Sequence, residues 1–464
     1  MKFGGSSVAT AERMRQIGEI LLTLDIKNEQ VILVVSALRN ITDQLLECAS
    51  LAANNQEDYK KIFKYISERH LELLSNLVEE KNNPLAYGSV KKILHELYKT
   101  LHSIQYLRDN DLYILDLVAS FGEQLSATIL AAYLNSLFPA RFVDARQFII
   151  TNNHFTNARV LYEESSHAIQ NYFDQFFKQE EEYTVPIVTG FIGMTKDKHA
   201  TTLGRDGSNY TLAVLGAALN ARVIEIWSDV DGVYSADPKL IPSSVVQPTL
   251  SYIEAEELSN FRVKVIRSAI IPQLIEKNIP MYVKNTFNPT AVGTYISLHA
   301  KSSAIKNVSV MHGLVLITLS TLFPIEISIS HIIERLFRVL PSAGIHLTLI
   351  TQTSSTHDVC FSIHETEAKR VQELINIEFL HEFQQNFLMI KKSANQSLIV
   401  LIGNNIKQLL SNLGKIFIDL DHHHIRLNGI AHGTSECNMS FVINSNQSHK
   451  ALEVIHHSIF QNPS

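Results

Sequence analysis

The chain has 464 residues, of which 45% are apolar and 19% are charged. This composition supports a folded core divided into about three domains, and it excludes a disordered or fibrous chain. Forty basic and forty-six acidic side chains give a formal net charge of −6 without basic blocks, so we expect neither nucleic acid nor a membrane as a partner. Three scattered cysteines exclude a disulfide framework and favour the reducing cytoplasm. The apolar runs are strand-sized, so we expect no membrane span.

The first 300 residues alternate apolar runs with helical patterns, which predicts an α/β sheet. Met14, Ile17 and Leu21 place one apolar face on a first helix. Long helices follow, with a break near Pro84. The predicted elements are helices at 11–24, 56–118 and 211–219, and strands at 30–37, 184–189 and 223–226.

The last 160 residues contain an internal repeat. Residues 345–363 and 425–443 align at an offset of 80, and each reads as two strands around a polar turn. A strand and a helix precede each pair, and a helix follows it, which predicts two β-α-β-β-α units in tandem. A polar, small-residue stretch at 299–307 marks the boundary before them. The flanking strands are expected at 313–320 and 397–403, and the helices at 331–340, 365–378, 406–420 and 449–460.

Two glycine turns could hold anions. The first, residues 2–7, places Gly4 and Gly5 beside Lys2, so that backbone amides and one full charge could meet a phosphate. The second, residues 203–210, contains Arg205, whose guanidinium can donate two parallel hydrogen bonds to a carboxylate or phosphate. Together they suit phosphoryl transfer, which depends on positioning and charge neutralisation. From these residues alone, two purely structural turns remain an alternative.

Other candidate groups are less informative. Residues 121–126 read as the start of a helix with Glu123 in its first turn, which could serve the helix dipole or bind a substrate ammonium. Contiguous His422, His423 and His424 cannot all face one ion from a regular element, so we predict no metal site there. No motif suggests a nucleophilic triad.

Seven motifs, taken in order, resemble the aspartokinase family, and most closely the kinase portion of bifunctional aspartokinase–homoserine dehydrogenases. The likeness extends over the whole chain, without the dehydrogenase. The motifs are KFGGSSVA (2–9), VVSA (34–37) with Thr42 beyond it, FGEQLSA (121–127), GFIGMT (190–195), LGRDGSNY (203–210), IWSDVDGVYSADPK (226–239) and ELSNFRVKV (257–265).

The resemblance implies an amino acid kinase fold, an open and mostly parallel sheet between helices, over residues 1–300. Two ferredoxin-like α+β ACT domains would follow at 308–392 and 393–464. The implied reaction phosphorylates the side-chain carboxylate of L-aspartate to 4-phospho-L-aspartate with ATP and Mg²⁺, the ion being held mainly through the ATP phosphates. This reaction is the first step of lysine, threonine, methionine and diaminopimelate biosynthesis.

The resemblance also implies a role for each motif residue. Lys2 and Asn209 would act in catalysis, with Lys2 neutralising the transferring phosphoryl group. Glu123 would take the substrate ammonium and Arg205 a carboxylate. The remaining residues implied for aspartate are Ser36, Thr42 and Ser208, and those implied for the nucleotide are Gly4, Gly5, Ser6, Ser228, Asp229, Tyr234, Lys239 and Lys264.

The chain departs from the family pattern at several positions. Asn209 replaces an aspartate, Arg262 replaces a glycine, and Arg267-Ser268 replaces His-Pro. These changes could tune or abolish activity, so an inactive ACT-containing amino-acid-binding paralogue is the alternative, and a kinase for glutamate or acetylglutamate is a third hypothesis. The first strand is unusually short, which a start upstream of Met1 would explain.

The ACT half would bind an amino-acid effector, threonine or lysine. The residues implied for it are Gln352, Ser354, His432 and Ser435. Segment 319–327 lacks the glycines of typical effector loops, so domains that only dimerise or stabilise the enzyme remain an alternative. The resemblance implies a homodimer or homotetramer assembled through these domains.

Overall fold

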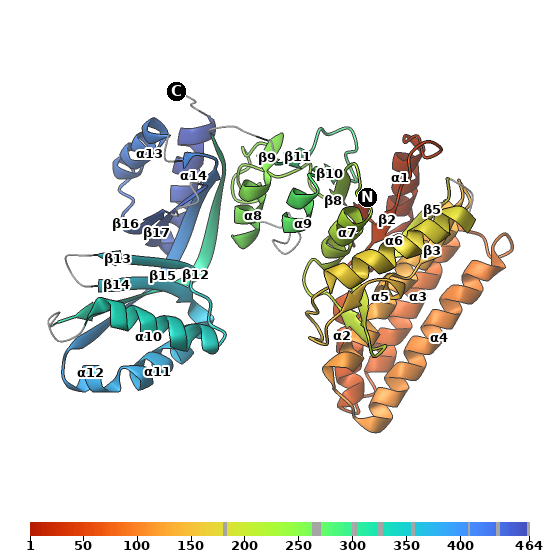
Figure 1. Ribbon diagram of the computed structural model, residues 1–464, viewed down its shortest axis with the longest axis horizontal. Coiled ribbons are helices and arrows are strands. Elements are labelled where there is room, and N and C mark those ends of the chain that lie inside the picture. Colours follow the sequence, from red (N-terminus) through yellow and green to blue (C-terminus); the bar gives the residue numbers. More distant parts are fainter. Residues whose placement is uncertain are drawn as a thin grey trace. The chain divides into compact units, whose positions relative to one another are not determined.

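The computed structural model describes residues 1–179, 183–261, 271–298, 300, 304–322, 328–353, 358–406, 409–432 and 437–461. It divides into two compact units (Figure 1). The first comprises Met1–Val233, Val246–Glu256 and Val265–Ala300, and the second comprises Tyr234–Val245, Glu257–Lys264 and Lys301–Ser464.

The first unit is built on an eight-stranded, mostly parallel sheet, as predicted. Among the described strands of this sheet, only β10 and β11 pair in antiparallel fashion. In sheet order the strands are β3 (Ala140–Val143), β5 (Val185–Thr189), β2 (Leu33–Val35), β1 (Lys2–Phe3), β8 (Ile224–Ser228), β10 (Met281–Asn285), β11 (Thr294–Ser297) and β9 (Thr249–Ser251). A small second sheet joins β4 (Ile150–Thr151), β6 (Ile192–Thr195) and β7 (Ala200–Thr202).

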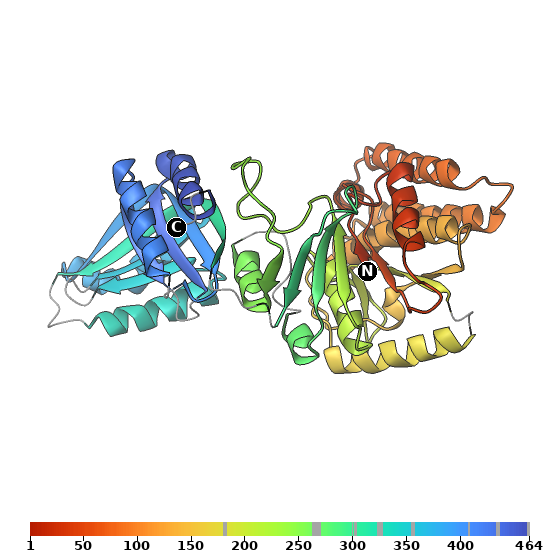
Figure 2. The same cartoon turned by 90° about the horizontal axis from the view of Figure 1, so that it is seen from above.

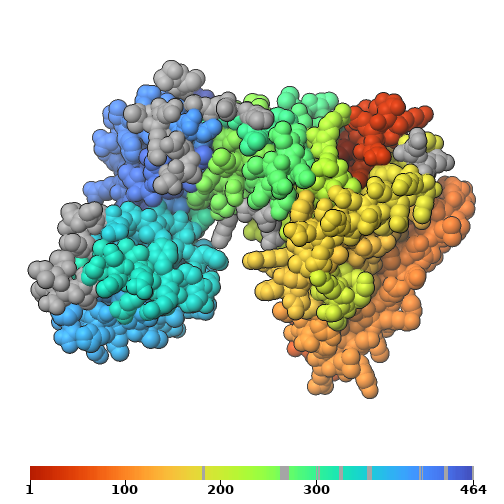
Figure 3. All heavy atoms as spheres, viewed as in Figure 1, coloured from red at the N-terminus to blue at the C-terminus, as the bar shows by residue number. Residues whose placement is uncertain are grey.

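Helices cover both faces of the large sheet. Figure 2 shows the strands between the yellow helix α6 and the red and orange helices, which is the layering that parallel strands require because both of their faces are apolar. The orange residues also form one end of this unit in the space-filling view (Figure 3). The helices are α1 (Ala11–Leu22), α2 (Ile41–Ala53), α3 (Tyr59–Leu77), α4 (Pro84–Leu107), α5 (Leu112–Leu134), α6 (Tyr162–Gln179), α7 (Gly207–Ala218), α8 (Tyr252–Asn260) and α9 (Ile271–Glu276).

Helix α5 corrects one sequence prediction. Residues 121–126 do not open a helix but lie in the middle of α5. Gly122 serves packing there, since a Cβ on it would lie only 2.8 Å from the Cβ of Ala37. The helix is long and apolar enough to span a membrane by length and composition alone, but 78% of its most apolar window is buried within the protein. Such burial is typical of a core helix.

The second unit contains the two predicted repeats joined in one sheet. The strands, in sheet order, are β13 (Leu349–Thr353), β14 (Asp358–His364), β12 (Ile305–Thr321), β15 (Leu388–Gly403), β17 (Asn438–Asn444) and β16 (Leu427–His432). The helices are α10 (Ile329–Ser342), α11 (Ala368–Glu378), α12 (Leu380–Gln384), α13 (Leu410–His422) and α14 (Ser448–Phe460).

The two long strands, β12 and β15, each serve both repeats. The second half of β12 pairs with β14, whereas its first half pairs with the second half of β15, which in turn pairs with β17. Accordingly, Ile305 and Val308 pack in one hydrophobic core with α13 and α14, and Ile317 and Leu319 pack in another with α10 and α11. The second module therefore takes a strand from residues that precede the first module, an exchange that a linear repeat does not reveal.

Candidate active site

The central strands of the first unit end together at one edge of the sheet. Strand β1 lies between β2 and β8, all three parallel, so Gly4, Ser36 and Asp229 follow adjacent strand ends. The amide of Gly4 donates to the carbonyl of Trp227 (3.2 Å) and the amide of Ser36 to that of Phe3 (3.3 Å). Open α/β sheets bind ligands at this carboxyl edge, so it is the candidate active site.

The first glycine turn lies tightly against the end of β2. A Cβ on Gly5 would lie 2.8 Å from the carbonyl oxygen of Ala37, so only glycine allows this approach. The Ser6 hydroxyl donates to Asp229 Oδ2 (3.4 Å), which connects the turn to the end of β8. Helix α1 begins at Ala11, so its amino terminus follows the turn by several residues rather than opening directly from it.

Lys2 is a partly buried cation at this edge. Burial lowers the pKa of its ammonium to about 8, although the carboxylates of Asp206 and Asp229 oppose the shift. Among the described residues, no hydrogen bond or ion pair reaches Lys2 Nζ directly, and this nitrogen would lie 3.5 Å from a Cβ on Gly4. An ammonium with this environment can receive an anion.

The second glycine turn lies near the end of β2, because Ser208 in the first turn of α7 contacts Ser36. The hydroxyls of Ser36 and Ser208 are 2.9 Å apart, and Asp206 is the residue before the helix, in the left-handed conformation (φ 57°). Asn209 lies in the first turn of α7, where its buried Oδ1 finds no partner among the described residues. Arg205 is exposed, and its guanidinium Nε lies 4.0 Å from Asp206 Oδ2. The sequence analysis missed Asp206, whose signal was a carboxylate next to Arg205 in a glycine turn.

Glu123 is a buried carboxylate at the same edge. Its Oε1 accepts from the amide of Ala37 (3.1 Å), while Oε2 is buried without a partner among the described residues. Desolvation raises the pKa of this carboxyl to about 8. Three residues later on α5, the Ser126 hydroxyl donates to the carbonyl of Ser36 (2.6 Å), a second contact that the sequence analysis missed. A free, buried carboxylate oxygen is suited to an ammonium group.

The other predicted residues fall into three groups. Ser228, whose carbonyl accepts from the amide of Thr286 (2.9 Å), and Thr42, the second residue of α2, belong to the first unit. Tyr234, Lys239, Gln352 and His432 belong to the second unit, where the Tyr234 carbonyl accepts from Asn307 Nδ2 (2.9 Å) and His432 Nδ1 lies 2.8 Å from the carbonyl of Asn438. Lys264, Ser354 and Ser435 lie outside the described residues, as do Arg262, Arg267 and Ser268.

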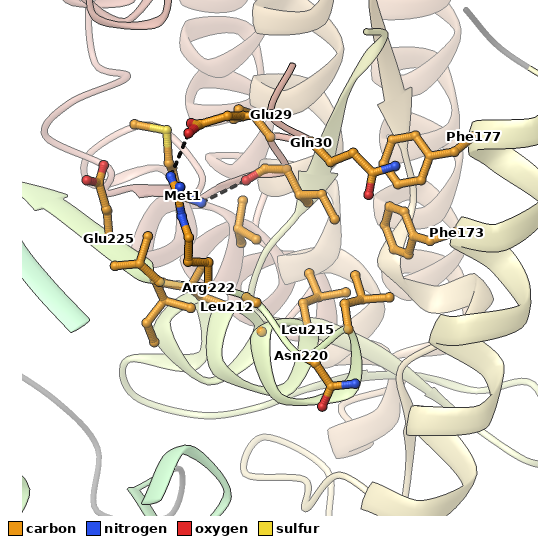
Figure 4. Close-up of a pocket in the computed structure, with 18 of the residues that line it drawn as sticks. Met1, Glu29, Gln30, Phe173, Phe177, Leu212, Leu215, Asn220, Arg222 and Glu225 are labelled. Carbon is orange, nitrogen blue, oxygen red and sulfur yellow. Dashed lines mark hydrogen bonds and ion pairs between the residues drawn. The ribbon is translucent and has the colours of Figure 1, made fainter. Parts of the chain in front are cut away.

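A cavity of about 800 Å³ lies at the opposite edge of the sheet (Figure 4). Phe173, Phe177, Leu212 and Leu215 line one side, and Arg222 forms an ion pair with Glu29 across its mouth. This cavity surrounds the amino ends of β2 and β8, so it contains none of the predicted site residues.

Comparison with known proteins identifies the family. The profile of the amino acid kinase family matches residues 1–285, and that of an ACT domain matches residues 399–459. Aspartokinase 2, a chloroplastic protein of Arabidopsis thaliana, is 30% identical over 99% of this chain and 84% of its own length. The chain belongs to the aspartokinase family. This assignment confirms the predicted fold class and the resemblance seen in the motifs.

Other relatives extend the comparison. The bifunctional aspartokinase/homoserine dehydrogenase of Haemophilus influenzae is 30% identical over the whole chain, which spans 56% of that protein. The chain thus covers about half the length of such relatives. Among solved structures, E. coli aspartokinase III in complex with aspartate and ADP shares the fold with a TM-score of 0.81 at 23% identity, over 99% of both chains. Clostridium acetobutylicum aspartate kinase gives a TM-score of 0.78, with the same coverage.

We predict that Glu123→Gln stabilises the free protein at alkaline pH. The pKa of this carboxyl is about 8 in the folded protein, against 4.5 ordinarily, so between these values the folded state holds a proton that the unfolded state releases. Stability therefore falls as the pH rises through this window, and the amide removes that loss. Thermal melting from pH 4.5 to 8 should show a variant that melts above the wild type at pH 8, with the difference shrinking towards pH 4.5. Exposed Glu72→Gln is the control, and a difference independent of pH would contradict the assignment.

Proposed function

We propose that this protein transfers the γ-phosphoryl group of ATP to the side-chain carboxylate of L-aspartate. A carboxylate oxygen attacks the γ-phosphorus, the bond to the bridging oxygen breaks, and 4-phospho-L-aspartate and ADP form. The observation that carries the proposal is a pair of groups at one sheet edge: the partly buried Lys2 ammonium for a phosphate, and the buried Glu123 Oε2, which has no partner among the described residues, for an ammonium. Membership of the aspartokinase family supports it, and one relative with this fold is described with aspartate and ADP bound.

In this proposal, the first glycine turn binds ATP and the second glycine turn binds aspartate. Gly4, Gly5 and Ser6 would hold phosphate oxygens, since the missing side chains let the backbone come close to the ligand. Lys2 would neutralise the charge that develops on the transferring group. Arg205 would bind a carboxylate of aspartate as a two-pronged donor, assisted by Ser36, Thr42 and Ser208.

The remaining nucleotide contacts come from the segment after β8. Ser228, Asp229, Tyr234, Lys239 and Lys264 would line this part of the site. Among the described residues, no group of three histidine, cysteine, aspartate or glutamate side chains could hold a metal ion. Mg²⁺ would be held mainly through the ATP phosphates, where it would lower the charge of the transferring group.

Regulation and assembly are assigned to the second unit. The ACT domain supports binding of an amino-acid effector, and a relative with the same fold, E. coli aspartokinase III, is described in complex with lysine and aspartate. We propose threonine or lysine as the effector, with Gln352, Ser354, His432 and Ser435 as contacts, and a homodimer or homotetramer formed through these modules. The protein would act in the cytoplasm at the first step of lysine, threonine and methionine biosynthesis.

Lys2→Ala should abolish most of the turnover without unfolding the protein. Loss of one positioned charge at a transition state costs about 10²–10³-fold in kcat. Because the pKa of Lys2 is about 8, wild-type activity should also fall as the pH rises above that value and the charge is lost. Aspartate-dependent ADP release in a coupled assay measures both effects, with exposed Lys27→Ala as the control. Near-normal kcat in Lys2→Ala would refute the role of Lys2.

A second candidate function, an attenuated or inactive paralogue, rests on Asn209, whose amide oxygen is buried without a partner among the described residues. Helix α7 packs against β1, so a carboxylate at this position would favour the charged form of Lys2. We expect Asn209→Asp to raise kcat and to move the alkaline loss of activity to higher pH. Asn220→Asp, past the far end of the same helix, is the control. Unchanged kcat and pH dependence would show that no carboxylate is required at position 209.

A further inference from the structure

Asp116 is a buried carboxylate of α5 with three hydrogen-bond donors. It is 1% exposed. Its Oδ2 accepts from the amides of Thr202 (3.0 Å) and Thr156 (2.9 Å), and its Oδ1 accepts from the hydroxyl of Thr202 (2.5 Å). Burying a carboxylate is costly, and these donors compensate it only while the segments that supply them stay in place. The carboxylate therefore fixes the positions of two separate chain segments.

Those segments support the second glycine turn. Thr202 ends β7, and the second glycine turn begins with the next residue, Leu203, followed by Gly204 and Arg205. The amide of Ala158 donates to the Thr202 carbonyl (2.9 Å), which joins the two segments to each other. Gly204 lies against the same loop, since a Cβ on it would come within 2.4 Å of Asn157 Oδ1. Asp116 thus holds both the base of the turn that presents Arg205 and the loop on which that turn rests.

The same helix carries Glu123. Glu123 lies seven positions after Asp116 in the sequence. This offset corresponds to two helical turns, or about 10 Å along one face of α5. A single rigid helix therefore determines where the ammonium acceptor lies and, through Asp116, where the Arg205 turn lies. Binding an amino acid at both its ammonium group and a carboxylate depends on that spacing. An error of about 1 Å in the position of a binding group can cost as much as 10²-fold in rate.

We propose that Asp116 is a positioning residue for the amino-acid substrate: it fixes the spacing between Glu123 and the Arg205 turn. The inference rests on the proposed function, in which these two residues bind the ammonium and a carboxylate of aspartate. The proposed role concerns aspartate and not ATP, since the hydrogen bonds of Asp116 go to Thr202 and Thr156, which support the second glycine turn, and not to the first glycine turn.

The test compares Asp116→Asn with the wild-type full-length chain in steady-state kinetics. An amide nitrogen would face one of the backbone donors and release it. We expect KM for aspartate to rise by about tenfold, the scale of one lost hydrogen bond to a charged group, with KM for ATP unchanged. Thr202→Val removes only the hydroxyl donor, so it is the milder second variant should Asp116→Asn fail to fold, and it should raise KM for aspartate in the same selective way.

Thr128→Val is the matched control, because this buried hydroxyl of α5 donates to the carbonyl of Gln124 in its own helix and, within the described part of the chain, to no other segment. It should leave both KM values unchanged. Equal rises in both KM values, or a fall in melting temperature without a rise in KM for aspartate, would overturn the positioning role. If the wild-type protein releases no ADP in the presence of aspartate, it is the proposed function that fails.

Discussion

Two titratable groups with desolvated environments, the Lys2 ammonium and the Glu123 carboxyl, lie at the carboxyl edge of the sheet in the first unit. Each pays for desolvation, which moves the pKa of the ammonium down to about 8 and that of the carboxyl up to about 8. A protein optimised only for stability would pair or replace such groups. Their retention at the carboxyl edge of a parallel sheet is explained when a ligand carrying both an anionic and a cationic group completes them.

A small number of contacts brings the site residues together at the carboxyl edge of the large sheet. Strand β1 has only two residues, yet its central position brings the ends of β2 and β8 beside its own. Helix α5 adds Glu123 and Ser126 against the end of β2, and Asp116 against the second glycine turn. In the second unit, the first half of β12 pairs with the second half of β15, so the second module is not a contiguous piece of chain. Long elements such as α5 therefore contribute both to the packed core and to the positions of the site residues.

The sequence predicted the helices, strands and motifs better than it predicted the surroundings of individual side chains. Helix α1, strand β5 and the repeat were visible because periodic apolar patterns report burial directly. The start of α5 was misjudged because Gly122, which permits close packing, resembles a helix boundary. Asp116 carried no pattern of its own, since its significance lies in contacts with distant segments of the chain. The free oxygen of Glu123 was equally invisible, because hydrogen-bond satisfaction depends on three-dimensional packing.

The central claim is that Glu123 is held ready for the ammonium group of the substrate, and calorimetric titration of aspartate at pH 7 tests it most directly. With a pKa of about 8, the Glu123 carboxyl is mostly protonated at this pH and must ionise when it binds an ammonium. Titrations in two buffers of different ionisation enthalpy should therefore show the release of about one proton per aspartate bound. Binding without proton release, or the same release from Glu123→Gln, would contradict the account.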